Sequence, residues 1–123
     1  MMGRIEEFNC EGKNFIYIDF SGLRSGKEFF EQIELVKPVI SKYPGLSVHT
    51  ITNVEDIRID VETKNIALEY LNHGKPYVKT AVIIGMDGIK KMMISTIIKL
   101  SGRKNVYFAF TKEKAIELIL RQY

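Results

Sequence analysis

The segment Phe15–Phe20 (FIYIDF) constrains this chain most strongly, because every residue in it except Asp19 is apolar. A strand that is apolar on both faces is covered on both faces, which is typical of a sheet flanked by helices. A polar stretch around Gly12 precedes it and predicts a turn from an earlier strand at Arg4–Asn9. The chain is therefore expected to begin with a hairpin whose second strand lies inside a sheet.

Further apolar segments alternate with segments of helical periodicity along the rest of the chain. The remaining predicted strands are Leu46–Thr52, Val78–Ile84 and Val106–Phe110. The predicted helices run from about Lys27 to Lys42, from Asp60 to about Asn72, from about Gly88 to Ser101, and onward from Thr111. Such alternation implies right-handed crossovers and a mainly parallel sheet. The sequence predicts an α/β fold of order β-β-α-β-α-β-α-β-α, with four helices flanking a mixed, mainly parallel five-stranded sheet.

Side chains at helical spacing predict which helix faces meet the sheet. In the first helix these are Phe29, Ile33, Val36 and Ile40. In the third helix Ile89, Met93, Ile97 and Leu100 form one apolar stripe, but Met92, Ile94 and Ile98 lie off it, so its sheet-facing side is left open. Asp60, Asp87 and Thr111 are suited to cap helix starts, and Gly74 and Gly102 to follow helix ends.

Length and composition indicate one domain covering residues 1–123. The chain has no repeat and no linker-like tract, and its 46% hydrophobic and 27% charged residues are ordinary for a globular protein. The lone Cys10 excludes an intramolecular disulfide and a thiolate zinc site, which fits a reducing compartment. With no signal-like N-terminus and no apolar stretch of bilayer length, we expect a cytoplasmic protein without an integral membrane segment.

Charge is distributed unevenly along the chain. Residues 1–62 carry a net charge of −4 and residues 63–123 a net charge of +7. Such an imbalance can mark a nucleic-acid or membrane surface, or the two halves can simply mix on the surface of a compact fold. Single-strand binding also needs exposed aromatic side chains, and Tyr107, Phe108 and Phe110 lie on a strand expected to be buried. We therefore expect no nucleic-acid partner.

No motif in the sequence specifies a reaction. The loop from Gly22 to Lys27 resembles a phosphate-binding loop, but it has three residues between its glycines instead of four, and Glu28 follows the lysine. The acidic residues near strand ends have no spacing that fixes a metal geometry, and neither histidine has a nucleophile motif beside it. We predict no catalytic residue, metal site or cofactor. An enzyme with an unrecognised site at the strand ends is the least favoured alternative.

The third predicted helix is the most informative element. It reads IKKMMISTIIKL from residue 89 and is apolar around much of its circumference. Methionine-rich surfaces adapt to varied partners, and basic residues flank this one. The helix either lies fully buried in the core or exposes an apolar face with a basic rim. The candidate contact residues are Lys90, Lys91, Met92, Met93 and Ile94.

Three short sequence segments and the order of elements resemble those of the SpoIIAA-like, STAS-like domains related to antagonists of anti-sigma factors. The segments are Phe15–Asp19 with the loop and helix that follow, Thr50–Val54, and Phe110–Ile116. The resemblance covers nearly the whole chain and implies a small βα superhelix. It also implies a second contact loop at a strand end, with Asn53, Asp56 and Asp60 as candidate residues.

The antagonists carry a phosphorylatable serine at the start of the second helix, and this chain departs from that pattern. The corresponding segment Asp56–Val61 contains neither serine nor threonine. The chain is therefore more similar to the branch without the switch, which resembles carriers of apolar molecules of the CRAL-TRIO kind. We expect a non-enzymatic binding module that contacts a protein partner or a second copy, as in a homodimer, through a face including the third helix. The alternative is a carrier of a small apolar, lipid-like ligand in a pocket lined by that helix.

Overall fold

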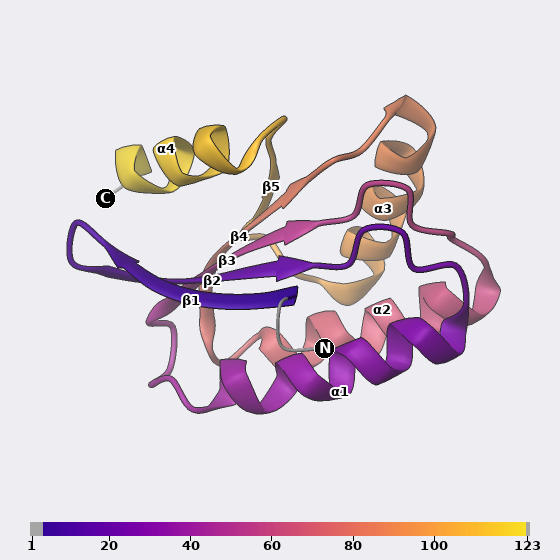
Figure 1. Ribbon diagram of the computed structural model, residues 1–123, viewed down its shortest axis with the longest axis horizontal. Helices are drawn as coiled ribbons and strands as arrows, with labels where there is room; N and C mark the ends of the chain where they lie inside the picture. Colours follow the sequence, from indigo (N-terminus) through magenta and orange to yellow (C-terminus); the bar gives the residue numbers. More distant parts are fainter. Residues whose placement is uncertain (1–3, 123) are drawn as a thin grey trace.

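The computed structural model describes residues 4–122, which form a five-stranded sheet with four helices (Figure 1). The strands are β1 (Ile5–Cys10), β2 (Lys13–Asp19), β3 (Val48–Asn53), β4 (Val78–Ile84) and β5 (Val106–Phe108). They lie in the sheet in their order along the chain. β1 pairs with β2 in antiparallel fashion, and the other pairs are parallel. The predicted α/β class and order of elements are confirmed.

Local capping groups define the starts of the helices. The helices are α1 (Gly26–Ser41), α2 (Val61–Gly74), α3 (Gly88–Ser101) and α4 (Lys112–Gln122). Ser25 caps α1, and Asp60 forms a capping box with Thr63 at the start of α2. The Asp87 carboxylate accepts a hydrogen bond from the amide of Lys90 at 2.9 Å, and the Thr111 hydroxyl accepts one from Lys114 at 3.1 Å. The predicted caps at Asp60, Asp87 and Thr111 are confirmed.

The helices are divided unequally between the two faces of the sheet. Figure 1 shows α1 and α2 side by side on one face and α4 alone on the other. α3 packs beside α2, and its Ile94 joins the larger core under α1 and α2. A smaller core forms where Ala115 and Ile119 of α4 pack with Phe15, Ile51 and Val82 of the sheet.

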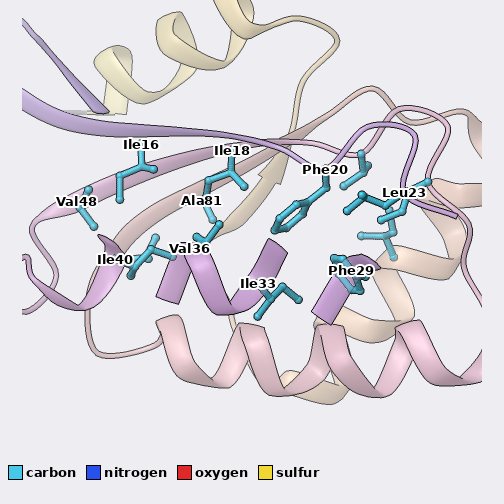
Figure 2. Close-up of a cluster of buried hydrophobic side chains, with 14 residues drawn as sticks. Ile16, Ile18, Phe20, Leu23, Phe29, Ile33, Val36, Ile40, Val48 and Ala81 are labelled. Atoms are coloured by element: carbon cyan, nitrogen blue, oxygen red, sulfur yellow. The ribbon is translucent and has the colours of Figure 1, made fainter. Parts of the chain in front are cut away.

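The larger core follows the predicted inner face of α1. Figure 2 shows Ile33, Val36 and Ile40 directed toward side chains of the sheet, among them Ile16 and Val48. All of these side chains are almost completely buried. No helix within residues 4–122 is long and apolar enough to cross a membrane.

Two strand predictions were too long. β5 ends at Phe108, because the chain turns away at the cap of α4, and Phe110 is 90% exposed. The expectation that the aromatic residues 107, 108 and 110 lie on a buried strand is therefore wrong. β3 begins at Val48, since Leu46 has a φ of 53° and precedes the strand in a turn.

The apolar stripe predicted along α3 is buried only in part. The helix turns Ile94 and Ile97 toward the core, whereas Ile89 and Leu100 of the predicted stripe are exposed. A helix that is apolar around most of its circumference does not reveal its buried face through periodicity. Its packing against α2 decides which face is buried.

Candidate functional site: an apolar cavity closed by α2 and α3

A cavity of about 100 Å³ lies between the sheet and the helices α2 and α3. Its lining is overwhelmingly apolar. The sheet contributes Thr50, Thr52, Ala81, Ile83 and Val106, α2 contributes Ala67, Tyr70 and Leu71, and α3 contributes Ile94, Ile97 and Ile98. The cavity therefore belongs to the same face of the sheet as the larger core.

Small side chains at the centre of the sheet explain why space is left here. Ala81 pairs with Thr50 across β3 and β4 and with Val106 across β4 and β5. Ala67 of α2 faces the same space. Because protein interiors are close-packed, two alanines at facing positions leave a gap that the neighbouring branched side chains fill only in part.

Arg103 supplies a buried positive charge to this otherwise apolar cavity. It directly follows Gly102, whose φ of 77° ends α3 and turns the chain, and it is only 9% exposed. Its Nε donates a hydrogen bond to Oδ1 of Asn105 at 2.8 Å, and its Nη1 donates one to the carbonyl oxygen of Leu71 at 3.0 Å. Its Nη2 is buried and has no hydrogen-bond partner within residues 4–122.

The charge of Arg103 has no acidic counterpart in the part of the chain that the structure describes, where it forms no ion pair. Burial lowers the pKa of the Arg103 guanidinium, but an arginine remains protonated in proteins. An isolated buried charge is costly, because the protein replaces little of its hydration. The cavity is therefore both apolar and electropositive at this end.

Tyr70 adds a neutral hydroxyl-bearing side chain to the lining. Its ring makes an edge-to-face contact with Phe20, with ring centroids 5.8 Å apart. Burial raises the pKa of Tyr70, and the charge of Arg103 opposes this shift only in part. The phenol is therefore protonated at neutral pH and is suited to hydrogen bonding rather than to acting as a base.

Arg58 lines the opposite end of the cavity, beyond the carboxyl end of β3. Its side chain is 62% exposed, and its Nε lies 3.6 Å from Oδ2 of Asp60. Arg103 instead lies beside the starts of β4 and β5, where Asn105 also contacts the carbonyl oxygen of Val78. The two arginines thus differ sharply: one is solvated and close to a carboxylate, and the other is buried without one.

The structure separates the residues predicted on α3 into two groups. Met92 is 73% exposed and Met93 is 40% exposed, and Lys91 beside them is exposed as well, whereas Lys90 lies one turn before Ile94 and is partly buried. The Nζ of Lys91 lies 5.2 Å from the centre of the Phe108 ring. Ile94 is buried and lines the cavity, so it does not belong to an outer contact surface.

The predicted residues of the strand-end loop do not line the cavity, and each has a local structural role. Asn53 accepts a hydrogen bond from the amide of Glu55 at 2.9 Å. Asp56 pairs with Arg24 at 3.1 Å on the surface, and Asp60 caps α2. Among the described residues no group of histidine, cysteine or acidic side chains is arranged to hold a metal ion.

The sequence places Tyr70 on the inner face of the second helix, but it singles out neither Tyr70 nor Arg103 as a site residue. Arg103 stands beside Lys104 in a short polar connection, where both residues look equally solvent-exposed in the sequence. Only the packing of the connection against the end of α2 distinguishes them. The position directly after a helix-ending glycine was the one local signal, because the chain reverses there and can direct a side chain back under the helix.

Comparison with known proteins gives no match, either to a protein-family model or to a curated protein. The geometry of the cavity therefore carries the functional argument.

Proposed function

We propose that this protein is a non-enzymatic binding module that holds a small apolar ligand in the cavity between the sheet, α2 and α3. The apolar lining of a cavity of about 100 Å³ is the observation that carries this proposal. An apolar hollow in the core forgoes packing contacts that close-packed side chains would make. A binding role gives a reason for keeping it. The resemblance to STAS-like domains of the branch without a phosphorylatable serine supports the same role.

The size of the cavity limits the ligand. An engineered apolar cavity of about 150 Å³ binds benzene. The cavity here is smaller, so it suits a branched group of a few carbon atoms rather than a long acyl chain.

Two positions on α2 provide a matched test, because leucine can be introduced inside or outside the cavity on the same helix. Ala67 lines the cavity, whereas Asn72 is exposed and does not line it. Binding of a neutral apolar probe, 3-methylbutanamide, is measured by NMR titration of the wild-type protein, Ala67→Leu and Asn72→Leu. We expect the wild type and Asn72→Leu to bind the probe with shifts confined to cavity residues, and Ala67→Leu to lose binding. Absence of binding to the wild type, or equal binding by the two variants, would contradict the proposal.

Native mass spectrometry provides a second test that does not depend on the probe. The protein is purified gently from several expression hosts and sprayed without denaturation. A bound mass that disappears in Ala67→Leu and remains in Asn72→Leu supports a ligand in this cavity. A bound mass that survives in both variants would place the ligand elsewhere on the protein.

A second candidate function is protein contact through the α3 outer surface, which consists of Ile89, Met92, Met93 and Leu100. Ile89 and Met92 are 75% and 73% exposed, and exposed apolar patches are typical of interaction sites. Sedimentation of the wild type and of a Met92→Asp, Met93→Asp double variant tests self-association. A concentration-dependent dimer that the double variant loses supports a contact between copies. A wild type that stays monomeric at all concentrations excludes it.

A further inference from the structure

We propose that the ligand of this cavity is a small monocarboxylate, whose carboxylate pairs with the guanidinium of Arg103 while its short branched hydrocarbon part occupies the apolar space. This inference rests on the proposed function and names the chemical class of its ligand. It follows from three properties of Arg103: its fixed position, its unpaired charge and the polarity of its surroundings.

The guanidinium of Arg103 is held in place by the protein itself. Asn105 accepts a hydrogen bond from Nε, and the Leu71 carbonyl oxygen accepts one from Nη1. One acceptor lies in the same connection as Arg103 and the other at the end of α2, so the planar guanidinium has little freedom to rotate. Nη2 carries two N–H groups, and it is the nitrogen that has no partner within the described residues. A donor fixed before binding lowers the entropic cost of capturing a ligand.

The charge of Arg103 favours an anion as the bound group. The residue is 9% exposed, and no described carboxylate forms an ion pair with it. Removing one partner from a buried ion pair is strongly destabilising because it leaves a charge without compensation. A ligand carboxylate restores that compensation and makes charge-assisted hydrogen bonds, which are stronger than neutral ones.

The rest of the lining favours a monoanion over a phosphate group. The rest of the lining consists mainly of aliphatic side chains, together with neutral groups such as those of Tyr70 and Thr50. Arg58, the other arginine of the lining, is solvated at the far end and lies 3.6 Å from Asp60. One fixed cation therefore matches one negative charge, and a dianion would bring a second charge into an apolar space without a partner.

The test compares two probes of the same shape. 3-Methylbutanoate and 3-methylbutanamide have the same branched hydrocarbon part, and only the first carries a negative charge. We expect the wild type to bind the carboxylate at least about tenfold more tightly than the amide, as measured by isothermal titration calorimetry or NMR titration, since hydrogen bonds to charged groups contribute at that level. Acetate, which has the same charge and almost no hydrocarbon, should bind much more weakly than 3-methylbutanoate.

Two arginine variants identify the binding group. Arg103→Gln is expected to lose the preference for the carboxylate, whereas Arg58→Gln, which alters the exposed arginine of the same lining, is expected to keep it. Equal affinities of the wild type for the two probes, or an unchanged preference in Arg103→Gln, would overturn the inference. The proposed function would stand in that case if the amide still bound and Ala67→Leu abolished its binding. If neither probe bound, both proposals would fail.

A measurement on the wild type covers the case in which Arg103→Gln does not fold. The Nε–H resonance of Arg103 is followed by NMR during titration with each probe. We expect 3-methylbutanoate to shift this resonance at saturation and 3-methylbutanamide to leave it nearly unchanged. Binding of the carboxylate without any change at Arg103 would overturn the inference without the use of a variant.

Discussion

Arg103 donates a hydrogen bond from Nη1 to the carbonyl oxygen of Leu71 at 3.0 Å, and so connects the loop after α3 to the last turn of α2. The last four carbonyl groups of a helix have no partner within the helix, and Leu71 carries one of them. Arg103 therefore completes the end of α2 and at the same time brings its charge to the cavity.

Arg103→Met is expected to destabilise the protein by about 1–3 kcal/mol, because it leaves the Leu71 carbonyl without its donor. Urea unfolding followed by circular dichroism measures this change. Arg121→Met serves as the control, since Arg121 is exposed and pairs with Glu117 on its own helix. The control should change the free energy of unfolding by less than about 0.5 kcal/mol. Equal effects of the two substitutions would contradict the role assigned to Arg103.

Asp87→Ala is expected to lower the free energy of unfolding by about 1 kcal/mol, because it removes the acceptor for the amide of Lys90 at the start of α3. Asp87→Asn retains a side-chain oxygen in the same position and should retain most of the stability. Thermal unfolding of both variants distinguishes the cap from a general effect of charge. An Asn variant as unstable as the Ala variant would favour the charge.

Gly85→Ala is expected to be far more harmful than Gly22→Ala, although both glycines have positive φ values of 85° and 75°. A Cβ at Gly85 would lie 2.5 Å from Oδ1 of Asn53 and 2.9 Å from the amide nitrogen of Glu55, whereas one at Gly22 meets no atom within 4 Å. We expect a loss of about 1 kcal/mol for Gly22→Ala from backbone strain alone, and about 3 kcal/mol or more for Gly85→Ala. Chemical denaturation of the pair gives the comparison, and similar losses would argue against a close approach of the two loops.

His49 is expected to make the protein less stable in mild acid. It lies in β3 and is almost fully buried, and burial, together with the charges of Lys79 and Lys13, lowers its pKa to about 4. Between that pKa and the unfolded value of 6.5 the unfolded chain binds more protons than the folded one, so stability falls as the pH falls through this range. The loss is at most about 3 kcal/mol.

Denaturant unfolding at a series of pH values between 4 and 7 measures the contribution of His49. His49→Gln removes the titrating group and should flatten the profile over the range in which the wild type loses stability. A wild-type stability that does not change between pH 6.5 and 4, or an unchanged slope in the variant, would show that the histidine is not held in its neutral form.

Helix boundaries could be predicted from the sequence because their signals are local. Asp60, Asp87 and Thr111 each make the expected contact with an amide three residues later, and Gly102 ends α3 with a positive φ. Gly74 differs from its prediction, since it is the last residue of α2 instead of following it. A Cβ there would lie 3.2 Å from Nη1 of Arg103, so this glycine leaves room for the guanidinium.

The candidate site could be predicted only in part, because it depends on contacts between distant segments. The alternative of a pocket lined by the third helix named no residue, and Ile94, which was expected in an outer contact surface, lines the cavity instead. Periodicity alone could not show whether Ile94 is buried, because α3 carries apolar residues around most of its circumference. The burial of Arg103 depends on Leu71, which lies 32 positions earlier, and no local pattern reports that contact.

The placement of α4 alone on its face of the sheet has a consequence for assembly during translation. Because every strand pairs with the strand that precedes it in the chain, the sheet can grow in the order of synthesis. Ile51 and Val82, however, gain their cover from Ala115 and Ile119 only when α4 has emerged. Until then the nascent chain presents an uncovered apolar face, and a partly folded chain with such a face is prone to aggregation. This face of the sheet is therefore protected from contact with other nascent chains only after α4 has been synthesised and has packed onto it.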